Sequence, residues 1–122
     1  MSHFLLAAVF VLGLAAPAAA GYWDDFDAAV QAYADGDYDA ARRGFEPLAK
    51  RGDHRSQYWL GIMYFEGEGV PQDRVRAYMW LSLAAEQGNR GARAGRDGIA
   101  HRMSKDQIAA AKALAAAWSP AD

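Results

Sequence analysis

Residues 56–88 of the chain read SQYWLGIMYFEGEGVPQDRVRAYMWLSLAAEQG. On either side of a central loop, apolar and small residues recur with the i, i+3, i+4, i+7 spacing of one helix face. Small residues such as Gly61 alternate with large ones such as Tyr64, which suits closely packed helices. The first stripe is Ser56, Leu60, Met63 and Tyr64, and the second is Ala77, Trp80, Leu81, Ala84 and Ala85. The stretch therefore predicts two antiparallel helices joined by a long turn.

The turn contains a Gly-x-Gly sequence, which serves either as a phosphate cradle or as a spacer between helices. A dinucleotide-binding loop follows a strand, carries a third glycine and opens a helix that faces the pyrophosphate. Here a helical pattern precedes the loop, no third glycine follows, and Glu66 and Glu68 add negative charge. We therefore predict a spacer, in which Val70 packs into the core and Asp73 caps the next helix.

An internal repeat supports the spacer. Tyr33 and Gly36 match Tyr64 and Gly67 at a spacing of 31 residues. Farther along, a second set of positions matches at a spacing of 36 residues. These pairs are Asp37 with Asp73, Ala41 with Ala77, Phe45 with Leu81, Ala49 with Ala85 and Gly52 with Gly88. The second unit has therefore gained five residues in its turn, and each unit is predicted to be one helix pair.

The rest of the chain is also helical in pattern. We predict helices at about residues 23–35, 38–51, 54–66, 72–87, 90–102 and 104–118, and no strand. Pro47 lies inside the second helix, so we expect a kink at residues 45–46 and a separate short final turn. N-cap residues are predicted at Asp53, Asp73, Asn89 and Ser104.

The first twenty residues contain no Asp, Glu, Lys or Arg, and residues 4–16 are almost wholly apolar. Small residues follow and end in Ala18-Ala19-Ala20, a pattern that signal peptidase accepts. The apolar run is shorter than the roughly 20 residues that a membrane-spanning helix needs. We predict a signal peptide at residues 1–20, a secreted or periplasmic location in a bacterial cell envelope, and no stable membrane span after cleavage. A retained N-terminal anchor is the alternative.

Charge and cysteine content narrow the function classes. The chain carries 13 basic and 15 acidic residues, and this mild net charge of −2 predicts no nucleic-acid partner. Residues 21–39 hold six Asp and no base, whereas residues 90–112 hold six bases and two Asp. Oppositely charged ends could stack head to tail in a homo-oligomer. Without Cys, the chain can form neither a disulfide nor a thiolate metal site.

Catalytic residues, cofactors and metals are not predicted. Penicillin-recognising enzymes need Ser-x-x-Lys, and no serine in the chain is followed by lysine at that spacing. His54 and His101 are far apart in the sequence and lack a histidine partner at i+4, so they do not form a metal-binding pattern.

The stretch at residues 56–88 resembles a Sel1-like repeat, a relative of the tetratricopeptide repeat. The matching positions are Leu60, Gly61, Tyr64, Gly67, Gly69, Val70, Asp73, Ala77, Trp80, Ala84, Ala85 and Gly88. The resemblance implies an all-α fold, a short α/α solenoid of antiparallel helix pairs. After the signal peptide predicted at residues 1–20, the chain then divides into a degenerate helix pair (21–53), a Sel1-like repeat (54–89) and a C-terminal capping helix pair (90–118).

Sel1-like proteins are generally adaptors that bind proteins or peptides, some of them in bacterial envelopes. The resemblance therefore implies an exported, non-catalytic adaptor or scaffold whose partner is a protein or peptide. Two alternatives remain. One is a self-assembling stacking unit, in which the acidic first helix meets the basic fifth helix. The other is a cell-wall or β-lactam hydrolase.

The docking surface is expected on the first helix of each pair, because these helices line the concave face of a solenoid. Tyr58 and Phe65 fall off the apolar stripe of their helix, so they are candidates for a shallow aromatic groove. The alternative, that they pack against the next unit, stays open. The proposed groove residues are Phe26, Asp27, Val30, Ala34, Gln57, Tyr58, Gly61 and Phe65. Core packing is expected instead for Trp23, Tyr33, Tyr64, Trp80 and Trp118.

Overall fold

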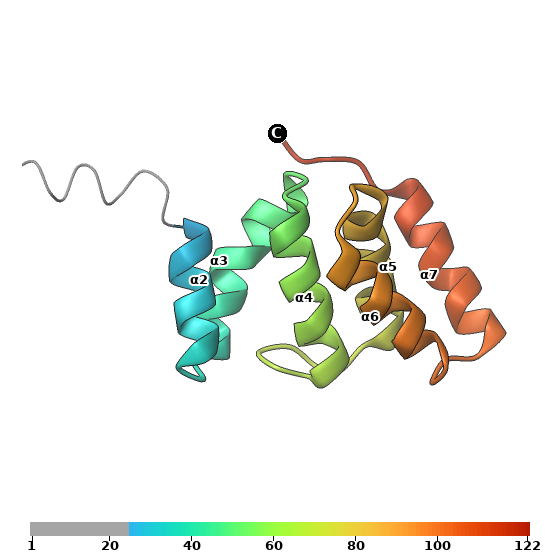
Figure 1. Cartoon of the computed structure of the whole chain (residues 1–122), viewed down its shortest axis with the longest axis horizontal. Coiled ribbons are helices and arrows are strands. Elements are labelled where there is room, and N and C mark those ends of the chain that lie inside the picture. Colours follow the sequence, from blue (N-terminus) through green and yellow to red (C-terminus); the bar gives the residue numbers. More distant parts are fainter. Residues whose placement is uncertain (1–24) are drawn as a thin grey trace, which may run out of the picture.

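The computed structural model describes residues 25–122, which form six helices and no strand (Figure 1). The predicted signal peptide at residues 1–20 and Trp23 lie outside this range. The helices are α2 (Asp25–Ala34), α3 (Tyr38–Lys50), α4 (His54–Glu66), α5 (Arg74–Glu86), α6 (Arg90–Ala100) and α7 (Lys105–Ala117). The all-α prediction is therefore confirmed, and the predicted helix boundaries agree to within a few residues.

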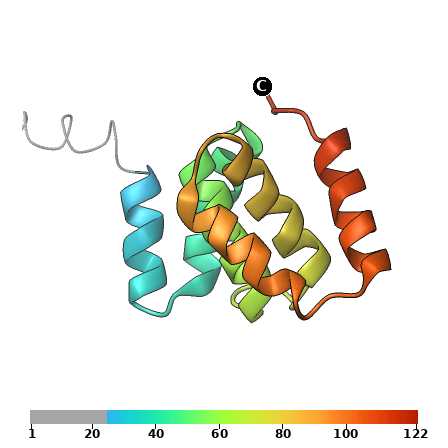
Figure 2. The same cartoon turned by 45° about the vertical axis from the view of Figure 1, so that its right-hand side comes forward.

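Successive helices pack on one another from α2 through α6, which makes a short α/α solenoid. Helices α2 and α7 stand at opposite ends of the stack (Figures 1 and 2). The last two helices do not form the expected hairpin. Helix α7 packs mainly along α5, and α6 also packs on α5. As a result α5 is the most enclosed helix, with eight buried residues.

The predicted caps form. Asp73 accepts a hydrogen bond from Arg76 N at 3.0 Å, and Asn89 accepts one from Ala92 N at 2.9 Å. The side chains of Asp53 and Ser104 cap α4 and α7 in the same way, and Ser104 completes a capping box. The turns that precede α3, α4 and α6 contain glycines with positive φ, at 81°, 103° and 95°. Local sequence therefore sets where each of these helices starts and stops.

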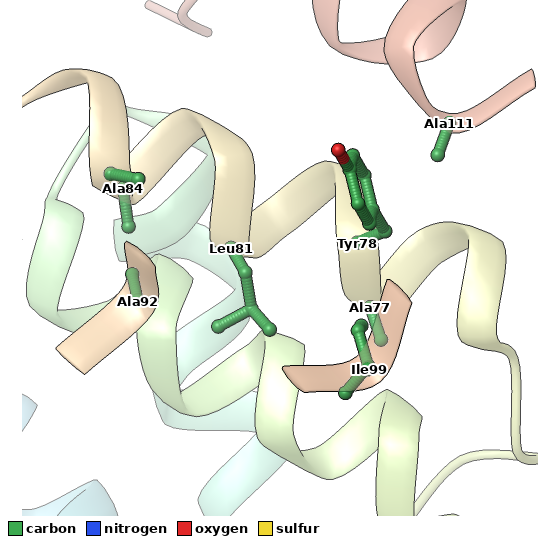
Figure 3. Close-up of a cluster of buried hydrophobic side chains, with 8 residues drawn as sticks. Ala77, Tyr78, Leu81, Ala84, Ala92, Ile99 and Ala111 are labelled. Atoms are coloured by element: carbon green, nitrogen blue, oxygen red, sulfur yellow. The ribbon is translucent and has the colours of Figure 1, made fainter. Parts of the chain in front are cut away.

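The core lies between the helices as three clusters of buried side chains. The largest is centred on α5, where Leu81 is fully buried between α4 and α6 (Figure 3). A Cβ atom at Gly61 would lie only 2.8 Å from Leu81 Cγ. Because Gly61 has no side chain, α4 approaches α5 closely enough to cover Leu81.

The expectation for Pro47 is corrected in one respect. Helix α3 is continuous from Tyr38 to Lys50, so no separate final turn follows Pro47. Phe45 and Ala49 flank the proline and are fully buried. Their packing holds the last turn in place, although the proline contributes no hydrogen-bond donor.

The residues after α7 turn back across the stack (Figure 1). Trp118 packs edge-to-face on Trp80, with ring centroids 6.4 Å apart. Three residues later, Ala121 N donates a hydrogen bond of 2.7 Å to Lys50 O, at the end of α3. This return segment, residues 118–121, joins the last helix to the first helix pair.

Replacing Gly61 with alanine should destabilise the fold. The new methyl group would meet Leu81, which is fully buried and has no room to move, so we expect a loss of about 1–3 kcal/mol. The measurement is chemical denaturation followed by circular dichroism. Gly98→Ala on α6 is the matched control, because a Cβ there meets nothing within 4 Å. It should be neutral or stabilising by up to about 1 kcal/mol, and equal losses in both variants would contradict the close-approach argument.

Candidate interaction surface

The turn after α4 packs against the preceding helix pair. Gly67 and Gly69 both have φ of +72°, and the N–H groups of Gly67 and Glu68 donate to Met63 O. A Cβ at Gly69 would lie 2.7 Å from Tyr38 O, so only glycine fits there. Glu68 accepts a hydrogen bond of 2.6 Å from the Tyr33 hydroxyl. The turn is therefore a spacer that docks on the first unit, with Glu68 as its polar contact.

Two details of this turn bear on its chemistry. Two of its backbone N–H groups close the end of α4, and Glu68 places a carboxylate in the turn, so an anion finds few donors there. Burial and the hydrogen bond to Glu68 raise the pKa of Tyr33 above its ordinary value.

Val70, which was expected in the core, is half-buried and belongs to none of the three buried clusters. Its position follows from the turn lying over α3 and not inside the stack.

On α2, the proposed groove residues are only partly available. Asp27 and Ala34 are exposed, whereas Phe26 and Val30 are half-buried against the buried cluster that contains Phe45. The ring of Phe26 meets that of Phe45 edge-on, with centroids 5.8 Å apart. The Arg55 guanidinium lies over the Phe26 ring, 4.1 Å from its centre. This cation–π contact joins α2 to α4 at the surface.

On α4, Gln57 and Gly61 were predicted to face a partner, and the structure corrects this. Gln57 is fully buried: its Nε2 donates to Ala49 O at 3.1 Å, and its Oε1 accepts from Gln87 Nε2 at 3.0 Å. Gly61 lies under α5. Neither residue can contact a partner, because α3 and α5 cover that side of α4.

Tyr58 and Phe65 are half-buried and pack toward α6. A Cβ at Gly91 would lie 3.3 Å from Tyr58 Cε1, and the Arg102 guanidinium lies 5.9 Å from the Phe65 ring centre. Tyr58 and Phe65 therefore pack in part against the next unit, which was the alternative to a groove. Both side chains remain partly exposed.

Sequence reasoning missed two residues that shape this surface. Trp59 stacks on Phe45 with an interplanar angle of 3° and centroids 5.8 Å apart, and it lies 4.9 Å from the Tyr33 ring. Its i, i+4 spacing to the buried Met63 was the available signal. Arg55 was also missed, because nothing in its local sequence reports the Phe26 ring on another helix. We define the exposed first-helix face as Asp27, Phe26, Arg55 and Tyr58.

Asp53 organises the start of α4. It accepts a hydrogen bond of 2.7 Å from Ser56 Oγ and pairs with Arg55 Nε at 3.2 Å. Burial by itself would raise the pKa of Asp53, but the hydrogen bonds from Ser56 and Arg55 outweigh it, and the pKa lies below its ordinary value. The ionised carboxylate is thus part of the folded state.

The described residues contain no metal-binding cluster and no helix that could span a membrane. No group of three or more His, Asp or Glu side chains in that range could hold a metal ion. None of the helices α2 to α7 has both the length and the apolar character that crossing a bilayer requires.

Residues 54–89, which comprise α4, the spacer and α5, match the family described as Sel1 repeat. A comparison with curated proteins found no match. The chain therefore contains a Sel1 repeat, as its sequence predicted, and this repeat is the central helix pair of the stack.

Asp53→Asn should flatten the acid limb of the stability profile. Folding lowers the pKa of Asp53, so its contribution is present above the ordinary carboxyl pKa and is lost as the pH falls through the lowered value. Asparagine keeps an N-cap oxygen but does not titrate. In urea denaturation between pH 6 and pH 2, the unaltered protein should lose more stability than the variant. Parallel profiles would show that ionised Asp53 adds nothing to folding.

Proposed function

We propose, from the Sel1 repeat that residues 54–89 form, that this protein is an exported, non-catalytic adaptor that binds a protein partner in the cell envelope. Sel1 repeats generally mediate protein–protein interaction, and the family is typically non-catalytic. The single observation that carries the proposal is this repeat, folded as a helix pair between two neighbouring units.

The surface we assign to the partner is the exposed first-helix face. It combines the exposed carboxylate of Asp27, the exposed guanidinium of Arg55 and the half-buried rings of Phe26 and Tyr58. Aromatic residues and arginine carry much of the binding energy in protein interfaces, because they bury a large area with few flexible bonds. Arg55 is already ordered by Asp53 and Phe26, so binding would immobilise it at little further cost.

Export is the part of the proposal that rests on the amino-acid sequence. The uncharged, apolar run and the Ala18-Ala19-Ala20 pattern support a signal peptide at residues 1–20. The absence of cysteine is compatible with any redox environment, since neither reduction nor oxidation can alter a disulfide in this fold. An envelope location would place the partner among exported proteins.

Self-association is a second candidate, favoured by the two ends of the stack. On α7, Leu114 is 45 % exposed, and it is surrounded by exposed alanines. At the other end, a depression of about 410 Å³ lies between α2 and α3 and is lined mainly by small residues, including Ala32 and Gly44. Asp25 and Arg43 also line it. These features support head-to-tail stacking of copies.

A charge reversal at Arg55 tests the adaptor proposal. Arg55→Glu removes the cation from the first-helix face and introduces a carboxylate in the first turn of α4. The helix dipole favours an acidic residue at that position. In capture from an envelope extract with the full chain as bait, partner recovery should fall at least about tenfold, as for loss of a well-placed interface arginine. Lys105→Glu, on the exposed first turn of α7, is the matched control and should capture normally. Equal recovery with both variants would exclude this face.

Size-exclusion chromatography at low and high salt tests the stacking candidate. Attraction between the acidic first helix, α2, and the basic fifth helix, α6, should weaken as salt screens it, so oligomers held by these charges should dissociate toward 0.5 M salt. Leu114→Glu should also abolish them, because it places a charge in the apolar contact. A monomer at every ionic strength would rule out stacking and leave the adaptor proposal untouched.

A further inference from the structure

The depression of about 410 Å³ between α2 and α3, which we call the end groove, is hollow because its lining is short. Four alanines and a glycine line it, together with Pro47 and Leu48. At Gly44 a Cβ would lie 2.7 Å from Ala29 Cβ, so the two helices approach closely there. The groove is therefore an apolar channel between two helices, with no large side chain of its own to fill it.

The internal repeat indicates what such a groove accepts. At the spacings of 31 and 36 residues, the small residues Ala29, Ala32 and Gly44 correspond to Leu60, Met63 and Trp80 of the second unit. In that unit Leu60 and Trp80 share a buried cluster with Ala49 of α3. Met63 shares another buried cluster with Phe45, also of α3. This face of the second unit thus receives a helix, whereas the same face of the first unit is the end groove.

The second helix of each pair carries a matching stripe, in which a large residue lies between two alanines at four-residue intervals. The stripes are Ala41, Phe45 and Ala49 on α3, and Ala77, Leu81 and Ala85 on α5, and all six residues are buried. Helix α7 has the same interval from Ala110 to Leu114, with Ala117 one turn farther on, and these three are exposed.

Leu114 is the exception among large apolar side chains. At 45 % exposure, it is the only one in residues 25–122 that is exposed. Helix α7 stands at the opposite end of the stack from α2 (Figures 1 and 2). The described chain therefore has an apolar knob at one end, without a groove to receive it, and a groove at the other end, without a knob.

We propose that α7 of a second copy docks in the end groove, with the Leu114 side chain among the alanines. Helix α7 then takes the place that α3 takes against the second unit, as a ridge packed between two helices. Because knob and groove lie at opposite ends, the contact is head to tail and can repeat from copy to copy. The inference rests on the self-association candidate, to which it adds the contact that holds the copies and its polarity.

The proposed contact is apolar, which separates it from attraction between the charges of α2 and α6. The charged residues that line the end groove are Asp25, Arg43 and Arg51, and all three are exposed to solvent. Salt screens attraction between exposed charges, but it does not weaken burial of a leucine side chain. Association through Leu114 should therefore persist at 0.5 M salt.

The test is complementation between two variants of the full chain. Leu114→Glu removes the knob and keeps the groove. Ala28→Trp fills the groove and keeps the knob. Ala28 is exposed, lines the groove and corresponds to Trp59 of the second unit, so the variant should fold.

The measurement is size-exclusion chromatography with light scattering at 0.5 M salt. The mass of the unaltered chain should rise with concentration. Each variant alone should associate at least about tenfold more weakly, as for loss of a buried leucine contact. An equimolar mixture should form a one-to-one dimer and nothing larger, because one intact contact remains between the two variants.

Two control variants add the same side chains elsewhere on the same helices. Ala109→Glu changes an exposed position five residues before Leu114, on another face of α7. Ala34→Trp changes an exposed position of α2 that is outside the groove lining. Both should associate as the unaltered chain does.

Several results would overturn the proposal. A mixture of the two variants that stays monomeric would exclude a head-to-tail contact. An unaltered chain that is monomeric up to about 1 mM would exclude the second copy as occupant. Equal losses in Leu114→Glu and Ala109→Glu would show that Leu114 is not the knob.

Other outcomes separate this inference from the proposed functions. Salt-sensitive oligomers that form equally in Leu114→Glu and Ala28→Trp would keep self-association through α2 and α6 and refute the groove contact. If the chain associates through Leu114 but captures no partner, the adaptor proposal fails and the groove contact stands. If Leu114→Glu captures a partner while the unaltered chain is always monomeric, the adaptor stands and the groove contact fails.

Discussion

The approach of α4 to α5 at Gly61 is the contact on which the rest of this structure depends. Leu81 lies against the bare backbone of Gly61 on one side and near Gly95 of α6 on the other, where a Cβ would be 3.5 Å from it. One leucine thus fills the space between three helices because two of them present glycine. Ala77, Ala84 and Ala85 on the same helix are also buried, so α5 keeps neighbours close along its length. A helix pair cannot bury such a stripe alone, and stacking follows from it.

Much of this arrangement could be predicted from the sequence, because it is encoded locally. N-cap side chains, glycines with positive φ and the 3.6-residue period each act within a few residues, so they marked where the helices begin and end. Pro47 and α7 were less predictable. The continuity of α3 depends on the burial of Phe45 and Ala49 by other helices. The position of α7 along α5 depends on packing between distant segments, which leaves no periodic signal.

The candidate sites show the same division. A helical wheel separates the faces of α4 but does not say which face the next helix will cover, so Gln57 and Gly61 were placed on the surface when they are buried. Arg55 likewise gained its place from Phe26, a residue on another helix.

The return segment, residues 118–121, changes how a stack of this kind can come apart. In an ordinary solenoid each unit contacts only its neighbours, so terminal units fray independently of the far end. Here the hydrogen bond from Ala121 N to Lys50 O connects positions 71 residues apart in the sequence, and the packing of Trp118 on Trp80 connects positions 38 residues apart. The return segment therefore links the end of the chain to the first helix pair, a contact that a linear solenoid lacks. Melting of the last helix removes support from the first pair, and a chain of this small size gains an all-or-none character that linear arrays lose.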